Sequence, residues 1–192
     1  LLFYPIQYEG QECSKNIFYT GAVPNQQVEP ATEFMLRRSP AAGKPFYLVG
    51  SDYVFPRTIN TITKYLLKDT GGKVIGEDYL PLGNINVNPI IRKIKYSLPS
   101  GGVIINTLNG WQNVAFFRQL QDEGITPENG YYVMNYSIAE EEIAAIGPEY
   151  LEGHYAAWNY MMSIDSKKSK EFVSNFQKRW GYNRIVADPQ ES

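Results

Sequence analysis

The sequence has little of the side-chain chemistry on which most enzymes and metal sites depend. Its 192 residues contain one cysteine, Cys13, and one histidine, His154. A single cysteine excludes an intramolecular disulfide and a cysteine-rich metal site. A single histidine argues against most metal and acid–base chemistry. We therefore expect no metal, no cofactor and no catalytic residue.

Charge and hydropathy exclude further classes. The net charge is −2, which leaves no basic surface for nucleic acid or an anionic membrane. No apolar run approaches the roughly 20 residues that span a bilayer. The sequence is rich instead in apolar residues, at 43%, and in tyrosine, with 15 copies. These features favour a globular protein with a real core, and recognition by ring faces and hydroxyls.

Apolar patterns along the chain predict alternating strands and helices. We expect strands at residues 46–49, 73–82, 103–108, 131–136 and 155–162. We expect helices at residues 28–38, 57–68, 88–98, 113–123, 139–146 and 166–180. Five alternations with short loops are typical of an α/β fold, a mainly parallel sheet with helices on both faces. Ligands of such sheets bind beyond the carboxyl ends of the strands.

Small polar residues follow the first of these strands. Ser51 and Asp52 precede a helix, and either could cap it by accepting from its free N–H groups. Tyr53 would then project over the edge of the sheet. A binding role and a purely structural role both remain open for this stretch. It lacks the further glycines of a dinucleotide fingerprint and the lysine of a Walker motif.

The later strand ends provide two more candidate side chains. Asn109 precedes Gly110 and could offer an amide to a ligand under the cover of Trp111, although Asn-Gly is ordinarily a turn. Ser137 could contact a ligand or cap the next helix. The acidic run at residues 140–142 is explained by the helix dipole rather than by catalysis.

No nucleophile, base and oxyanion site come together in this pattern. We interpret His154 as structural, and Cys13 has no basic neighbour in sequence. Hydroxyls, ring faces and amides at strand ends remain. Such groups suit a small neutral polar ligand that is held by directed hydrogen bonds between aromatic faces.

Several stretches resemble the urea-binding subunit of bacterial urea ABC transporters and the related amide-sensing regulator of aliphatic amidase operons. These stretches are Leu2-Phe3-Tyr4-Pro5-Ile6-Gln7-Tyr8-Glu9-Gly10, Pro24-Asn25-Gln26-Gln27, Gly50-Ser51-Asp52-Tyr53-Val54-Phe55-Pro56-Arg57, residues 99–110 and Ser163-Ile164-Asp165-Ser166. The resemblance runs over essentially the whole chain. It implies a type I periplasmic binding protein, in which two α/β lobes close on a ligand.

The resemblance also implies a division of the chain. Residues 1–24 would be the end of a first lobe and the crossing between lobes, residues 25–187 the second lobe, and residues 188–192 the start of a return crossing. We accordingly expect a piece of a larger two-lobed protein. Residues 1–6 should then lack their native sheet neighbours and be left exposed, paired with another chain or folded against the lobe.

Site residues carry over from the resemblance as expectations. Tyr4 and Tyr53 match tyrosines that line the amide cleft in relatives, and Ser137 lies near a hydroxyl-bearing position. Ile6 stands where the amide regulator has a hydroxyl residue, a contact that Gln7 could replace. Trp111 is a second departure, because a small or acidic residue is expected there. With the strand-end residues, the expected ligand-binding set is Tyr4, Gln7, Ser51, Tyr53, Asn109 and Ser137.

The function that the resemblance implies is extracytoplasmic capture of urea or a short-chain amide for an ABC transporter, without catalysis. The partners would be the small neutral ligand and the permease subunits of the transporter. An amide-sensing regulator of an amidase operon is the alternative. A branched-chain amino-acid-type binding protein is a further one.

Overall fold

A computed structural model describes residues 1–10 and 12–186. Its main sheet has five parallel strands in the order β4-β3-β5-β6-β7, and a separate sheet pairs β1 with β2, also in parallel. The strands are β1 (Leu2–Tyr4), β2 (Ile17–Tyr19), β3 (Phe46–Ser51), β4 (Val74–Leu80), β5 (Gly102–Thr107), β6 (Tyr131–Asn135) and β7 (Tyr155–Ala156). The expected α/β class with a parallel sheet is confirmed.

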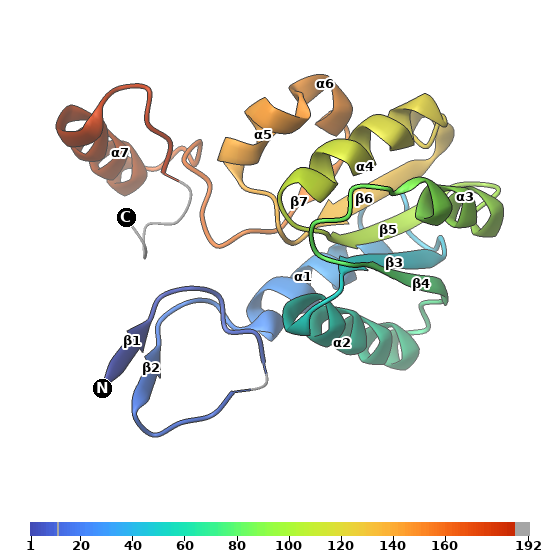
Figure 1. Cartoon of the computed structure of the whole chain (residues 1–192), viewed down its shortest axis with the longest axis horizontal. Coiled ribbons are helices and arrows are strands. Elements are labelled where there is room, and N and C mark those ends of the chain that lie inside the picture. Colours follow the sequence, from blue (N-terminus) through green and yellow to red (C-terminus); the bar gives the residue numbers. More distant parts are fainter. Residues whose placement is uncertain (11, 187–192) are drawn as a thin grey trace.

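Seven α-helices connect or flank the described strands (Figure 1). They are α1 (Pro24–Arg37), α2 (Val54–Thr70), α3 (Asn88–Ser97), α4 (Trp111–Asp122), α5 (Glu140–Ile146), α6 (Pro148–Leu151) and α7 (Lys167–Trp180), with a short 3₁₀ turn at Pro127–Asn129. Helices α1 and α2 cover one face of the sheet, and α3, α4 and α5 cover the other.

The central strands divide their side chains between two cores. Phe46 and Leu48 of β3 pack with α1 and α2, whereas Tyr47 and Val49 pack with α3 and α4. Successive side chains of a strand point to opposite faces, so a strand that is covered on both sides is mostly apolar. Every residue of β3 and β5 is buried accordingly. We call this unit, from α1 to β7, the body.

The last strand of the sheet is shorter than expected. The apolar run at residues 155–162 predicts a full strand, but β7 contains only Tyr155 and Ala156. Its neighbour β6 ends at Asn135, which pairs with Ala156, and the Ala157 N–H makes one further bond to the Asn135 carbonyl. Beyond that point the sheet offers no backbone partner, so the chain leaves it.

Strands β1 and β2 and helix α7 lie apart from the body and on the same side of it (Figure 1). We call residues 1–10 and 12–22 the N-terminal arm. Within the described residues β1 pairs with β2 alone, and Leu1 and Phe3 are 90% and 67% exposed. Residues 1–6 are thus largely exposed, as expected, but β1 has a sheet partner in β2, and the identity of its native neighbours stays a prediction. The division at residues 24 and 187 stays a prediction, and residues 188–192 lie outside the described residues.

Candidate functional site at the carboxyl edge of the sheet

The carboxyl ends of β3, β5 and β6 lie side by side. Gly50 pairs with Thr107, and Asn106 pairs with Asn135, so these strands end at one edge. Helices α2 and α4 begin at the same edge. Three sequence-predicted residues are gathered there because each follows the end of its own strand by no more than a short turn: Tyr53, Asn109 and Ser137.

Tyr53 and Asn109 form a polar pair at this edge. The Asn109 Nδ2 donates a hydrogen bond to the Tyr53 hydroxyl, and both residues are partly exposed. Burial raises the pKa of Tyr53, the hydrogen bond from Asn109 opposes that rise, and the charge of Glu9 adds to it. The phenol therefore stays protonated at neutral pH and has its own O–H to donate.

The buried Ser51 fixes the position of Asn109 in this pair. Its side chain is fully buried, its hydroxyl donates to Gln112 Oε1, and it accepts from the Asn109 N–H at 3.0 Å. The expectation that Ser51 or Asp52 caps the next helix is wrong. The N-cap of α2 is Tyr53 and has no side-chain cap bond, while Asp52 pairs with Arg57 at 2.7 Å.

A buried amide network underlies the same edge, and sequence reasoning missed it. Asn106 Nδ2 donates to Asn113 Oδ1 at 2.8 Å and to Asn135 Oδ1 at 2.7 Å. Asn106 Oδ1 accepts from the Leu108 N–H at 3.0 Å. A buried polar group needs such partners. The signal was an asparagine near the end of each of two apolar strands, β5 and β6.

The remaining predicted residues have different surroundings. Ser137 is partly exposed beyond β6, at the start of the turn into α5, whose N-cap is Ala139 rather than Ser137. Tyr4 lies in the N-terminal arm, where its ring packs edge-to-face on Tyr19 at 5.8 Å. Gln7, also in the arm, donates to Gln27 Oε1 of α1 at 2.7 Å.

One acidic side chain of the arm acts on tyrosines in both regions. Burial raises the pKa of Tyr4, and the charges of Glu9 and Glu12 add to that rise. Burial likewise raises the pKa of Tyr53, and Glu9 adds to that rise as well. Burial in turn raises the pKa of Glu9.

His154 and Trp111 lie outside the polar pair at the carboxyl edge. His154 Nδ1 accepts from the Val133 N–H at 3.1 Å, and its ring packs on Phe117, so the structural interpretation is confirmed. Burial lowers the pKa of His154 to about 4. Trp111 is the first residue of α4 and is 74% exposed at the rim of the edge.

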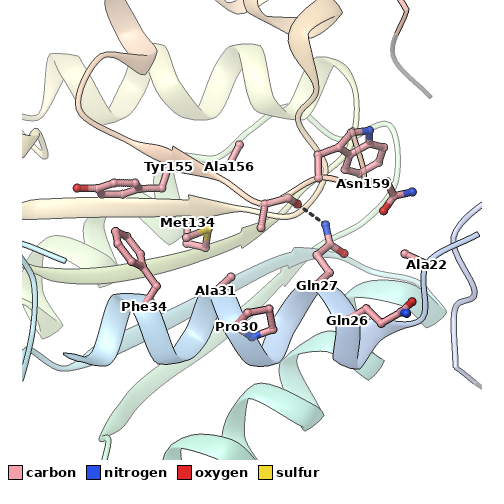
Figure 2. Close-up of a pocket in the computed structure, with 12 residues that line it drawn as sticks. Ala22, Gln26, Gln27, Pro30, Ala31, Phe34, Met134, Tyr155, Ala156 and Asn159 are labelled. Atoms are coloured by element: carbon pink, nitrogen blue, oxygen red, sulfur yellow. Dashed lines mark hydrogen bonds between the residues drawn. The ribbon is translucent and has the colours of Figure 1, made fainter. Parts of the chain in front are cut away.

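A separate cavity of about 610 Å³ lies on the side of the body where α1 faces β7 (Figure 2). Its walls include Phe34 and Gln27 of α1, Met134 of β6, Tyr155 of β7 and Asn159. None of the six predicted ligand-binding residues lines it. Among the described helices, none combines the length and the apolar character needed to cross a bilayer.

A family model described as a periplasmic binding protein domain matches residues 1–192. The chain belongs to this family. It is a family of binding proteins rather than enzymes, and its members are periplasmic, which confirms the expected class and the extracytoplasmic location. The urea or amide subgroup is not identified by this match.

Solved structures of solute-binding proteins share the fold. A protein from R. palustris in complex with 4-hydroxybenzoate is 24% identical, with a TM-score of 0.77 over 91% of this chain and 46% of that one. An amino acid ABC transporter protein from Pseudomonas fluorescens Pf-5 is 20% identical, with a TM-score of 0.76 over 98% and 49%. A protein from Rhodopseudomonas palustris HaA2 in complex with p-hydroxybenzoic acid is 26% identical, with a TM-score of 0.75 over 86% and 44%. The chain thus spans about half the length of these structures.

Proposed function

We propose that the body is one lobe of a solute-binding protein that serves an ABC transporter, and that it takes its ligand at the carboxyl edge of the sheet. The family and the fold support this function. The matched solute-binding proteins are about twice as long, which is in keeping with a second lobe. Binding would favour the closed arrangement of the lobes and present the ligand to a permease.

The ligand that we propose is a small uncharged polar molecule, with urea and short-chain amides as the leading candidates. The observation that carries this choice is the chemistry of the edge. Tyr53, Asn109 and Ser137 offer a phenol, an amide and a hydroxyl, all without charge. An amide ligand has donors and acceptors to match such groups.

The charges around the edge support the same choice. Burial, and after it the negative charge of Glu9, raises the pKa of Tyr53, which favours an uncharged ligand over a carboxylate there. Arg57, the cation that follows Tyr53 most closely along the chain, is already paired with Asp52 at 2.7 Å and lies over the Tyr79 ring. A carboxylate ligand would therefore need its cation from the second lobe or from the helix N-termini.

An aromatic carboxylate is the second candidate, because two similar structures hold hydroxybenzoate. The rings of Tyr53 and Trp111 at the edge would suit an aromatic ligand. Branched-chain amino acids remain a further candidate from the same set of neighbours. The amide-sensing regulator remains the alternative function, and the similar structures, which are ABC transporter proteins, favour transport over it.

Calorimetric titration of the two-lobed protein with urea, acetamide, 4-hydroxybenzoate and leucine tests the proposal. We expect saturable binding of urea or acetamide, and none of the two carboxylates. Saturable binding of 4-hydroxybenzoate or leucine, with urea and acetamide inert, would contradict the neutral-ligand proposal while leaving the solute-binding function standing. Absence of binding for all four would count against both.

A further inference from the structure

Gln27, near the start of α1, joins three segments that are far apart in sequence. Its Nε2 donates to the Tyr136 carbonyl at 3.2 Å, just beyond β6, and to the Ala157 carbonyl, just beyond β7. Its Oε1 accepts from Gln7 Nε2 at 2.7 Å. Figure 2 shows the side chain extending from α1 towards the segment that follows β7. We call these four residues the Gln27 clasp.

The clasp is a buried and saturated set of hydrogen bonds. Gln27 is 5% exposed, both of its N–H groups are donated and its oxygen accepts. A primary amide has two donors and one carbonyl oxygen, so a single side chain can serve three partners. A buried group with this many partners is costly to misplace, because each lost bond leaves a partner unsatisfied.

Two of the three partners of Gln27 stand where the chain leaves the body. Gln7 belongs to the N-terminal arm, which carries β1 and β2 away from the main sheet. Ala157 is the last residue bonded to β6 before the chain runs towards α7. The chain therefore enters the body from the N-terminal arm and leaves it after β7, and Gln27 bonds to a residue of each of these two connecting segments.

We infer that Gln27 is a positioning residue that fixes the direction in which both connecting segments leave the body. The inference rests on the proposed function in one respect, since the outlying segments are taken to lead to the second half of the ligand site. Residues at the ends of elements absorb the rotations of domain closure. A clasp at that point sets the starting arrangement, and preorganisation of this kind increases ligand affinity.

Two backbone hydrogen bonds of the described arm stay within the arm. The Tyr8 N–H donates to the Ala22 carbonyl at 3.0 Å, and Thr20 bonds back to Tyr4, but all four residues belong to the arm. Gly10 approaches Thr58 of α2 closely as well. The bond between Gln7 and Gln27 links the described arm directly to α1.

A distance measurement between spin labels tests the inference without any ligand. Cys13 is the only cysteine of the sequence and is exposed in the arm, so it takes one label. Lys68→Cys on the exposed face of α2 takes the other. We expect a narrow distance distribution in the unaltered clasp, and a broader one displaced to longer distance in Gln27→Met and in Gln7→Met.

Matched variants separate positioning from stability. Glu29→Gln changes an exposed residue of the same helix and should leave the distribution unchanged. Gln27→Glu keeps an acceptor for Gln7 but loses both donors while it is ionised. On acidification its carboxyl regains one O–H donor, so its distribution should narrow as the pH falls. Gln7→Met breaks only the bond to the arm. If Gln27→Met does not fold, the Gln7→Met variant alone provides the test.

Unchanged distributions in both methionine variants would overturn the inference. Broadening in Gln27→Met without broadening in Gln7→Met would also overturn it, because the effect would then pass through the body rather than through the clasp. Both outcomes are read without a ligand. A failure to find any ligand counts against the proposed function and leaves this distance result intact.

Discussion

The five-stranded sheet and the two-stranded sheet of β1 and β2 differ in how much apolar surface they bury. Both are parallel, and both contain aromatic residues. Phe46 of β3 is fully buried between α1, α2 and the sheet, whereas Phe3 of β1 is 67% exposed and stacks on Phe18 at 5.2 Å. A two-stranded sheet has no second layer to cover it, so the body holds its own core and the arm does not.

The largest expected effect on stability comes from a pair of matched truncations that tests this difference. Phe46→Ala removes a fully buried ring and should cost about 4 kcal/mol of unfolding free energy. Phe3→Ala removes an exposed ring and should cost less than about 1 kcal/mol. Urea denaturation followed by circular dichroism measures both. Equal losses would mean that the arm shares the core of the body.

A smaller effect is expected from the amide network at the carboxyl edge. Asn106→Leu removes two donated bonds and leaves the Leu108 N–H without its acceptor, at a cost of about 3 kcal/mol. Asn25→Leu, at an exposed position of α1, is the control and should change stability by less than about 0.5 kcal/mol. A loss no greater than the control would show that the network does not hold the edge.

The first test concerns the central strands, which the sequence predicts well. The second concerns the amide network, which the sequence does not predict. The central strands could be predicted because each has a run of four or three apolar residues, at residues 46–49 and 103–105, followed by glycine or polar residues. The edge positions of Tyr53, Asn109 and Ser137 followed from strand ends alone. The pairing of Asn106 with Asn135 could not, because it depends on the register between two strands.

Two other features could not be predicted, for related reasons. Tyr155 to Met162 has the apolar content of a strand, but how far it pairs depends on where β6 ends. The partners of Gln27 are 109 and 130 residues away along the chain, so no local pattern reveals them. Long-range pairing, rather than local propensity, decided each of these cases.

The single histidine gives a pH test confined to the body. Because burial lowers the pKa of His154 from 6.5 to about 4, the folded state binds fewer protons than the unfolded state between these values. The associated stability is complete above pH 6.5 and is lost as the pH falls towards 4. We expect a loss of about 2 kcal/mol from this residue.

His154→Gln is the matched variant for this pH dependence. Its side-chain oxygen can still accept from the Val133 N–H, and it does not titrate. Unfolding free energies at pH 7 and pH 4.5 should therefore fall less in the variant than in the unaltered protein. Identical losses would assign the acid sensitivity to other groups.

The smallest expected effect on stability is at the proposed ligand site. Tyr53→Phe removes the hydroxyl that accepts from Asn109, at a partly exposed position, and should change unfolding free energy by about 0.5 kcal/mol. We expect ligand affinity to fall about tenfold, because the phenol is a proposed ligand contact. Tyr65→Phe, at an exposed tyrosine of α2, should leave affinity unchanged. Calorimetry with urea and acetamide measures both, and an unchanged affinity in Tyr53→Phe would remove this residue from the site.

The location of the ligand is the central claim, and nuclear magnetic resonance tests it most directly. Two regions compete for the ligand, the carboxyl edge with Asn109 and the cavity between α1 and β7 with Tyr155. Titration with the ligand found by calorimetry should shift the Asn109 side-chain amide and the backbone amides of residues 51–54, with little change at residues 155–157. Shifts confined to residues 155–157 and the facing turns of α1 would contradict the account.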